Sequence, residues 1–259
     1  MAVSDQASLD AMVAAYTSGP KFDQWSRYRD SGLHSEELAL VRTHCRDLGA
    51  AILNLGCGSG RETFGLYRMG YHNVQGADCT DALLRVAKQG CGQDGPRIAF
   101  TLADAAHLPF ADATFDVVTY FENLYGHIMP GSSRRSALRE ARRVLKPGGL
   151  ALMIVTSLYD VWRYAAAIRA FEVVRKFYNP QAMERGDKWM KSEGPFRRKR
   201  EWVARSHWFR PNEVPADAAA VGLTVVQTTT IAGILKNPMV DLPKTHGGGR
   251  LIYVLKRPA

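Results

Sequence analysis

A run of glycines after residue 55 constrains the fold of this chain more than any other feature. Residues 51–55 are apolar apart from Asn54 and lead directly into Gly-Cys-Gly-Ser-Gly at 56–60, after which helix-forming residues follow. This order predicts a buried strand, a tight turn and the N-terminus of a helix. Glycine permits positive φ angles and close approach of a ligand to the backbone. Because the free N–H groups of a helix start suit a carboxylate or phosphate, the turn is a predicted ligand site.

Two common nucleotide-binding motifs do not fit this turn. A dinucleotide fingerprint needs a further glycine at position 61 or 63, where the chain has Arg61 and Thr63. A phosphate-binding P-loop ends in Gly-Lys-Ser or Gly-Lys-Thr, which is also missing here. An apolar strand that ends in Gly-x-Gly-x-Gly instead resembles motif I of the class I S-adenosylmethionine-dependent methyltransferases.

Three later segments match the same family in the expected order. Asp78 ends a predicted strand over residues 73–78 and lies 18 residues after Gly60, about where α/β nucleotide folds present a carboxylate to ribose hydroxyls. A carboxylate suits two neighbouring hydroxyls because it accepts both hydrogen bonds; the alternative is a helix cap. The other segments are Asp-Ala-Ala-His-Leu-Pro-Phe at 104–110, which the family places at the adenine, and Val-Leu-Lys-Pro-Gly-Gly at 144–149, a turn before the fifth strand.

The resemblance implies an α/β fold and one methyltransferase domain over residues 1–259. That fold is a Rossmann-like, seven-stranded, mostly parallel sheet with an antiparallel last strand and helices on both faces. We expect a terminal hairpin from 223–231 and 251–256 with a long connection between them, and a helix that Ser35 caps and Gly49 ends. The implied cofactor is S-adenosyl-L-methionine. The cofactor-binding residues predicted on this basis are Asn54, Gly56, Gly58, Gly60, Asp78, Cys79, Asp104, Ala105, Phe121 and Glu122.

The exit of the fourth predicted strand, residues 115–121, discriminates among methyl acceptors. Methyltransferases of nucleic-acid amines typically carry Asn/Asp-Pro-Pro-Tyr/Phe there, and those of pyrimidine carbons use a cysteine. Residues 121–127 contain neither. The segment is similar to the Asn-x-x-x-His stretch of small-molecule methyltransferases, and Asn123 and Tyr125 are therefore predicted in the substrate pocket.

A general base is needed only if the acceptor carries its proton into the transition state. His127 is the predicted base, because histidine titrates near neutral pH and this one lies on the exit segment; a structural hydrogen-bonding role is the alternative. Tyr16 and His207 are the reserve candidates. Tyr16 belongs to an aromatic-rich N-terminal arm over residues 1–34, whose rings either fasten the arm to the core or close over the cofactor.

Residues 158–206 form an insertion relative to a minimal methyltransferase. It contains twelve Lys and Arg against six Asp and Glu, with helical periodicity over 161–178 and a basic run at 197–200 between aromatic residues. It is interpreted first as a lid that supplies aromatic walls and cations to an anionic substrate. The other interpretations are a solvated face and an RNA-binding surface.

Composition bounds the remaining choices. A formal net charge of +9 and a pI near 9.5 allow an acidic partner. The four cysteines have no metal-ligand spacing, so no metal is predicted. With no leader-like or membrane-spanning run, the expectation is a cytoplasmic protein without a membrane partner. The predicted activity is methyl transfer to an O or N atom of a small-molecule acceptor, which can be anionic. The alternatives are an RNA methyltransferase, with nucleic acid as partner, and a non-catalytic cofactor-binding protein; the oligomeric state stays open.

Overall fold

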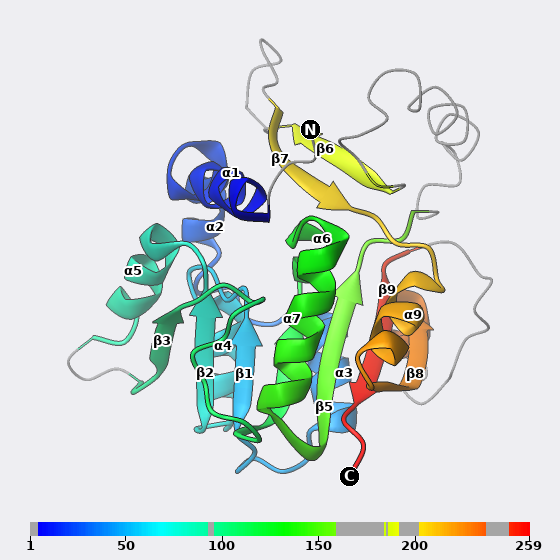
Figure 1. Cartoon of the computed structure of the whole chain (residues 1–259). Helices are drawn as coiled ribbons and strands as arrows, with labels where there is room; N and C mark the ends of the chain where they lie inside the picture. Colours follow the sequence, from blue (N-terminus) through cyan, green and yellow to red (C-terminus); the bar gives the residue numbers. More distant parts are fainter. Residues whose placement is uncertain (1–4, 93–95, 159–183, 185, 192–201, 237–248) are drawn as a thin grey trace.

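A seven-stranded sheet runs through the middle of the molecule (Figure 1). The computed structural model describes residues 5–92, 96–158, 184, 186–191, 202–236 and 249–259. The strand order in the sheet is β3-β2-β1-β4-β5-β9-β8. Its strands are β1 (Ile52–Leu55), β2 (Val74–Asp78), β3 (Ala99–Leu102), β4 (Phe115–Tyr120), β5 (Leu145–Val155), β8 (Thr224–Thr230) and β9 (Leu251–Lys256).

Strand direction in this sheet follows the prediction. β1 pairs in parallel with β2 on one side and with β4 on the other, and β3 and β5 extend the parallel part outwards. β9 is antiparallel to both β5 and β8. The expected mostly parallel sheet with an antiparallel last strand is confirmed. Because the strand order reverses between β1 and β4, the crevice at their carboxyl ends is where such a sheet binds ligands.

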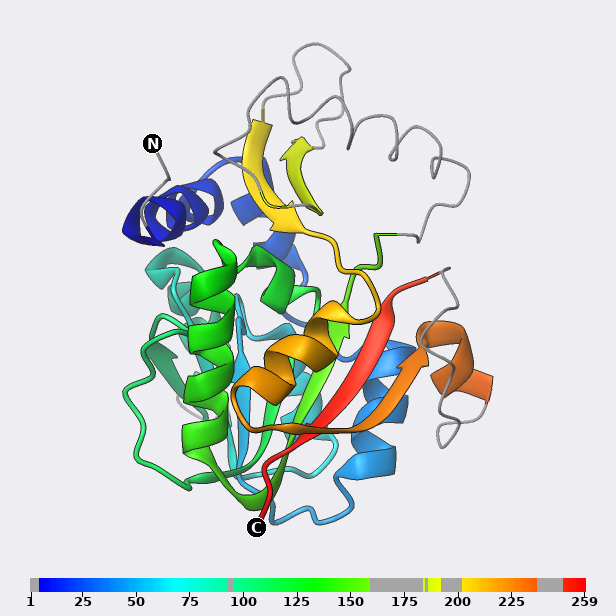
Figure 2. The same cartoon turned by 45° about the vertical axis from the view of Figure 1, so that its right-hand side comes forward.

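Helices cover both faces of the sheet, as expected (Figure 2). One hydrophobic core joins the sheet to α7 and α9, with Leu138 and Val214 fully buried in it. A second core on the other face takes in α3, α4, α5 and α10, with Leu40 and Leu66 fully buried. The helices are α1 (Asp5–Thr17), α2 (Pro20–Arg27), α3 (Ser35–His44), α4 (Arg61–Arg68), α5 (Asp81–Gln89), α6 (Leu124–His127), α7 (Gly131–Val144), α9 (Glu213–Ala220) and α10 (Ile231–Lys236).

Two small units lie over the carboxyl edge of the sheet, at the top of Figure 1. One is the pair α1 and α2, into which the predicted N-terminal arm folds, and α1 packs against α2, α5 and β7. The other is a two-stranded antiparallel sheet of β6 (Asp187–Lys191) and β7 (Trp202–His207). The predicted helix over 161–178 and the basic run at 197–200 lie outside the described residues. No helix in the described ranges has the length and apolar content needed to cross a membrane.

Three local predictions differ from the structure. α3 starts after His34 rather than at a Ser35 cap and ends at His44, before the turn in which Asp47 Oδ1 accepts the Gly49 N–H at 2.8 Å. Residues 146–149 belong to β5 because the C-terminal segment pairs with them: Arg257 N donates to Gly149 O at 2.9 Å. The connection after β8 begins with α10, whose Ile234 packs in the second core.

Candidate active site

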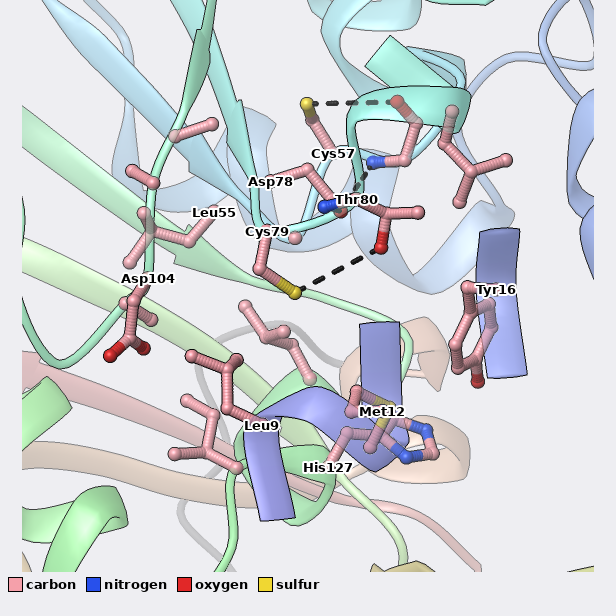
Figure 3. Close-up of a pocket in the computed structure, with 18 of the residues that line it drawn as sticks. Leu9, Met12, Tyr16, Leu55, Cys57, Asp78, Cys79, Thr80, Asp104 and His127 are labelled. Atoms are coloured by element: carbon pink, nitrogen blue, oxygen red, sulfur yellow. Dashed lines mark hydrogen bonds between the residues drawn. The ribbon is translucent and has the colours of Figure 1, made fainter. Parts of the chain in front are cut away.

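A cavity of about 290 Å³ lies at the carboxyl ends of β1, β2 and β4. Its wall on the side of the sheet comes from the glycine turn, from the loops after β2 and β3, and from the loop after β4. On the opposite side, Leu9, Met12 and Tyr16 of α1 cover it (Figure 3). The described residues thus close a space of roughly the size that ligand pockets have, about 300 Å³ or more.

The glycine turn needs glycine for reasons that differ along it. Gly56, Gly58 and Gly60 all have positive φ angles, of 63°, 51° and 94°, which L side chains rarely adopt. A Cβ on Gly56 would lie 2.5 Å from Leu124 Cδ1, and one on Gly60 would lie 2.7 Å from a ring atom of Phe64. A Cβ on Gly58 would meet no atom closer than Leu83 Cδ1, at 3.7 Å, and Gly58 lines the cavity. Gly56 and Gly58 therefore border the ligand space, whereas Gly60 shapes the turn beneath it.

Asp78 stands at the end of β2 beside this turn. Its Oδ2 accepts the Gly58 N–H at 2.9 Å and its Oδ1 accepts the Thr80 N–H at 2.8 Å. The carboxylate therefore holds the turn and the start of α5 together, and it lines the cavity. Burial raises the pKa of Asp78 despite these hydrogen bonds. Burial and the neighbouring Asp78 also raise the pKa of Cys79 to about 12, so the Cys79 thiol is protonated at neutral pH.

Asp104 stands at the far end of the cavity, in the loop after β3, and Ala105 lines the cavity beside it. Its Oδ1 accepts the Ala106 N–H at 3.0 Å and its Oδ2 bonds His107 Nδ1 at 2.9 Å. The carboxylate is partly exposed. Because each oxygen makes only one such bond, lone pairs remain for a ligand group.

A buried arginine gathers three carboxylates behind the turn. Arg61, the first residue of α4, is 2% exposed and lies 2.7 Å from Glu37, 2.6 Å from Glu62 and 3.4 Å from Glu122. Its remaining contact is a hydrogen bond to Gly32 O at 2.8 Å. Burial raises the pKa of Glu62, although Arg61 opposes this. Arg61 therefore compensates its carboxylates and has no charge left for an anionic ligand.

The loop after β4 is held in an unusual conformation. Glu122 and Asn123 have φ angles of 48° and 60°, which are uncommon for residues other than glycine and cost energy that surrounding contacts must offset. Glu122 is fixed by His34 Nδ1 at 3.0 Å and by Arg250 Nη1 at 3.4 Å. The loop presents Phe121 and Glu122 to the cavity, as predicted for these positions.

His127 lines the cavity next to Tyr16, with ring centroids 6.4 Å apart in an edge-to-face arrangement. Its Nδ1 is buried and has no partner among the described residues. Burial lowers the pKa of His127 to about 4, and the ring is neutral at neutral pH.

Several predicted residues lie outside the cavity lining. Asn54 is fully buried beneath the turn, where its Nδ2 donates to Thr63 Oγ1 at 2.9 Å and its Oδ1 accepts from Thr119 Oγ1 at 2.8 Å. It joins β1 to α4 and β4. Gly60 likewise lies beneath the lining. Asn54 and Gly60 therefore support the shape of the turn, whereas we had predicted from the sequence that both would contact the ligand directly.

The predicted substrate residues Asn123 and Tyr125 also point away from the cavity. Asn123 Nδ2 donates to Ser206 Oγ at 2.9 Å, and the fully buried Tyr125 donates from its hydroxyl to Asp217 at 2.9 Å. His207 is buried in the β6–β7 unit rather than in the lining. For Asn123 and Tyr125 the short α6 explains this outcome, because Leu124 and His127 occupy its cavity side.

Other lining residues were not predicted from the sequence. Leu9 and Met12 lie on the same side of α1 as Tyr16, at the three- and four-residue spacing that marks one helix face. Ile128 and Met129 extend the apolar wall beyond His127. Trp25 contributes a buried indole Nε1 without a partner among the described residues. The spacing in α1 was the available signal, although an apolar helix face usually indicates a core.

Residues 52–149 match the family model described as a methyltransferase domain. The relatives include the methyltransferase GfsG of Streptomyces halstedii, 39% identical over 103 residues, which are 39% of this chain and 36% of that protein. They also include a demethylmenaquinone methyltransferase of Clavibacter sepedonicus, 40% identical over 139 residues, which are 50% of this chain and 54% of that protein. The chain contains a class I S-adenosylmethionine-dependent methyltransferase domain.

Solved structures of methyltransferases share the fold. A methyltransferase from Methanosarcina mazei superposes with a TM-score of 0.67 at 18% identity, over 88% of this chain and 99% of that one. At this identity the likeness concerns the fold alone. Matches to the curated relatives named above span 36% and 54% of their lengths, so those proteins' substrates do not transfer directly to this chain.

The cavity of the methyltransferase domain suits S-adenosylmethionine, the family's cofactor. Among the described lining residues, carboxylates outnumber the single arginine, which already pairs with three of them or their neighbours, and this favours a sulfonium and an ammonium group. Asp78 and Asp104, at separate positions along the cavity, retain acceptor capacity for ribose hydroxyls and an adenine amine. Trp25 also lines the cavity, and its buried indole N–H has no acceptor among the described residues.

Proposed function

We propose that this protein transfers the methyl group of S-adenosylmethionine to a protonated oxygen or nitrogen atom of an uncharged small molecule. The observation that carries the proposal is the imidazole of His127 at the cavity wall beside Tyr16, which burial keeps neutral. A neutral imidazole has one nitrogen with a lone pair, which accepts a proton. The acceptor that fits it brings its own O–H or N–H.

The charge of the cavity also bears on the acceptor. The described lining has four carboxylates, on Glu62, Asp78, Asp104 and Glu122, and one guanidinium, on Arg61. Because Arg61 is already shared by three glutamates, an anionic acceptor would meet uncompensated negative charge. We therefore propose an uncharged acceptor in place of the anionic one that the basic insertion suggests. The name of one relative, a demethylmenaquinone methyltransferase, also supports an uncharged organic acceptor.

The main contribution of this chain to the reaction is to position the acceptor against the methyl group. S-adenosylmethionine supplies a methyl carbon that is already activated by its sulfonium. Holding an acceptor in line with that carbon contributes on the order of 7–11 kcal/mol to such a reaction. Leu9, Met12 and Ile128 provide apolar contacts for the acceptor's body. As the new bond to the methyl carbon forms and the carbon–sulfur bond breaks, the neutral imidazole of His127 takes the acceptor's proton.

Tyr16 complements His127 without competing for that proton. Burial raises the pKa of Tyr16, and the nearby Asp78 and Cys79 raise it further. The phenol therefore stays protonated and serves as a hydrogen-bond donor, whereas His127 is the proton acceptor. α1, which carries Tyr16, also separates the cavity from solvent, which strengthens the electrostatic interactions inside it.

The test combines a binding measurement with a transfer assay. Calorimetry is expected to detect both S-adenosylmethionine and S-adenosylhomocysteine. A transfer screen should favour uncharged phenols, alcohols and amines over carboxylates, phosphates and bulk RNA. The variant His127→Gln should keep cofactor affinity and lose about 10²- to 10⁴-fold in kcat. Binding without turnover on any acceptor, transfer confined to RNA, or full activity of His127→Gln would refute the proposal.

A further inference from the structure

The loop after β3 runs alongside α7 (Figure 2). Its first four residues, 104–107, form a compact turn, in which Asp104 O accepts the His107 N–H at 2.9 Å. The Asp104 carboxylate bonds the Ala106 N–H and the His107 ring within the same turn. All four residues line the cavity. The place of the Asp104 carboxylate is therefore set by the place of the turn as a whole.

The residue after this turn, Leu108, is held by α7 through both of its backbone polar groups. Its N–H donates to Glu140 Oε2 at 2.7 Å, and its carbonyl accepts from Arg143 Nη2 at 2.9 Å. Its side chain is buried in the first core. Pro109 follows, and a proline restricts its own backbone and that of the residue before it. The turn that carries Asp104 thus ends at a residue with a fixed position.

Arg143 also holds the rest of the loop. Its Nη1 donates to Phe110 O and to Asp112 Oδ1, each at 2.7 Å. Its Nε and Nη2 donate to the two carboxylate oxygens of Glu140, both at 2.8 Å. The hydrogen bonds from Arg143 lower the pKa of Glu140, so this carboxylate is ionised at neutral pH. Because a guanidinium is a rigid planar fork, it fixes the geometry of all these partners together.

One face of α7 borders the cavity and holds the loop. Ser133 and Ser136 line the cavity. Glu140 and Arg143 continue the same face, since the four residues follow one another at spacings of three and four. Leu138 anchors the helix in the first core, where it is fully buried. The helix that holds the loop is therefore also a wall of the cavity, and the two keep a constant relation to each other.

We propose that Glu140 and Arg143 are positioning residues for the nucleobase of the cofactor, which keep the 104–107 turn where the Asp104 carboxylate selects a purine with an exocyclic amine. Adenine has this amine, whereas hypoxanthine has an oxygen in its place. An ionised carboxylate only accepts hydrogen bonds, so it finds no donor on that oxygen. Neither Glu140 nor Arg143 belongs to the described lining, so both act through Leu108. The inference rests on the cofactor and not on the proposed acceptor.

The variant Arg143→Lys tests this role, because lysine keeps the charge but not the planar fork. Calorimetry measures Kd for S-adenosylhomocysteine and for S-inosylhomocysteine, its hypoxanthine analogue, and the readout is the ratio of the two values. The wild type should prefer the adenine compound about 10- to 150-fold, the range for a hydrogen bond to a charged group. Arg143→Lys should lower this preference about tenfold, as one such bond is weakened. A loss of stability alone weakens both ligands equally and leaves the ratio unchanged.

Arg257→Lys is the matched control. Arg257 Nη1 donates to the carbonyls of Arg142 and Arg143, each at 3.1 Å, at the end of the same helix. None of its hydrogen bonds within the described part of the chain reaches residues 104–112. This variant should lose stability in urea and keep the wild-type preference for the adenine compound.

If Arg143→Lys does not fold, Glu140→Gln weakens the same contacts, because one carboxylate oxygen becomes an N–H₂ group that cannot accept a hydrogen bond. A folded Arg143→Lys or Glu140→Gln variant with the wild-type ratio would overturn the inference, as would a wild type that binds both compounds equally. The measurement needs no methyl acceptor. Absence of transfer by the wild type, or full activity of His127→Gln, would refute the proposed function alone.

Discussion

Replacing Asp78 by asparagine is the sharpest test of the cofactor site. The two carboxylate oxygens accept the N–H groups of Gly58 and Thr80, at 2.9 and 2.8 Å. Alanine would leave both donors unpaired inside the protein, so a loss of binding could reflect a distorted turn. Asparagine keeps the shape and one acceptor oxygen, and its amide N–H₂ then faces one backbone donor. We expect Asp78→Asn to fold, with about 1–3 kcal/mol less stability from the unsatisfied donor.

The loss in cofactor affinity follows from the hydrogen bonds that a carboxylate makes to ribose hydroxyls. A hydrogen bond to a charged group contributes about 1.5–3 kcal/mol. At about 1.4 kcal/mol for each factor of ten, removal of the charge should weaken binding about 10- to 150-fold. Calorimetric titration with S-adenosylhomocysteine measures this value for wild type and variant, and urea unfolding measures the stability of each.

Asp116→Asn is the control for this experiment. Asp116 stands at the amino end of β4, where Oδ2 accepts the Ala51 N–H at 2.9 Å and pairs with Lys146 at 2.8 Å. It resembles Asp78 in tying a strand end to a neighbouring backbone, but it is absent from the cavity lining. It should lose stability and keep its affinity. A folded Asp78→Asn with unchanged affinity, or an equal loss of affinity in both variants, would refute the role given to Asp78.

Two further predictions follow from the geometry. Gly56→Ala places a Cβ 2.5 Å from Leu124 Cδ1 at a φ of 63°. Its free energy of unfolding in urea should therefore fall by about 2–4 kcal/mol, from overpacking and from left-handed backbone strain. The control is Gly148→Ala, which has a φ of 81° and no atom within 4 Å of the new Cβ, so it should show the effect of the strain alone. Because the pKa of His127 is lowered to about 4, its active neutral form persists as pH falls below 6.5. We therefore expect kcat/KM to decline only as pH approaches about 4. A decline of kcat/KM near pH 6.5, in protein that circular dichroism shows to be folded, would contradict the assignment of His127 as base.

The sequence predicted the sheet, and several of the residues that it suggested for the cofactor line one cavity. The glycine turn predicted a strand, a tight reversal and a helix start, and Gly56, Gly58 and Gly60 all adopt positive φ angles. Asp78 was predicted from its spacing after the turn and Asp104 from the family pattern at 104–110, and both line the cavity. These features are encoded locally, because a turn of given shape allows few residue types and each parallel strand ends at the same edge of the sheet.

Roles that depend on distant partners were not predicted. Nothing near Arg61 in the sequence indicates that it gathers Glu37 from α3 and Glu122 from the loop after β4. His207 was grouped with the candidate bases by residue type, yet its surroundings give it two carboxylate partners and no access to the cavity.

The sequence alone therefore determined the type of sheet, the glycine turn and the acids that follow it, since motif spacing and periodicity depend on neighbours along the chain. Only the tertiary structure decided that α1 covers the cavity and that His207 lies between two carboxylates outside it. The protonation state and orientation of a buried side chain are set by the groups packed around it, and those come from segments that are far apart in sequence.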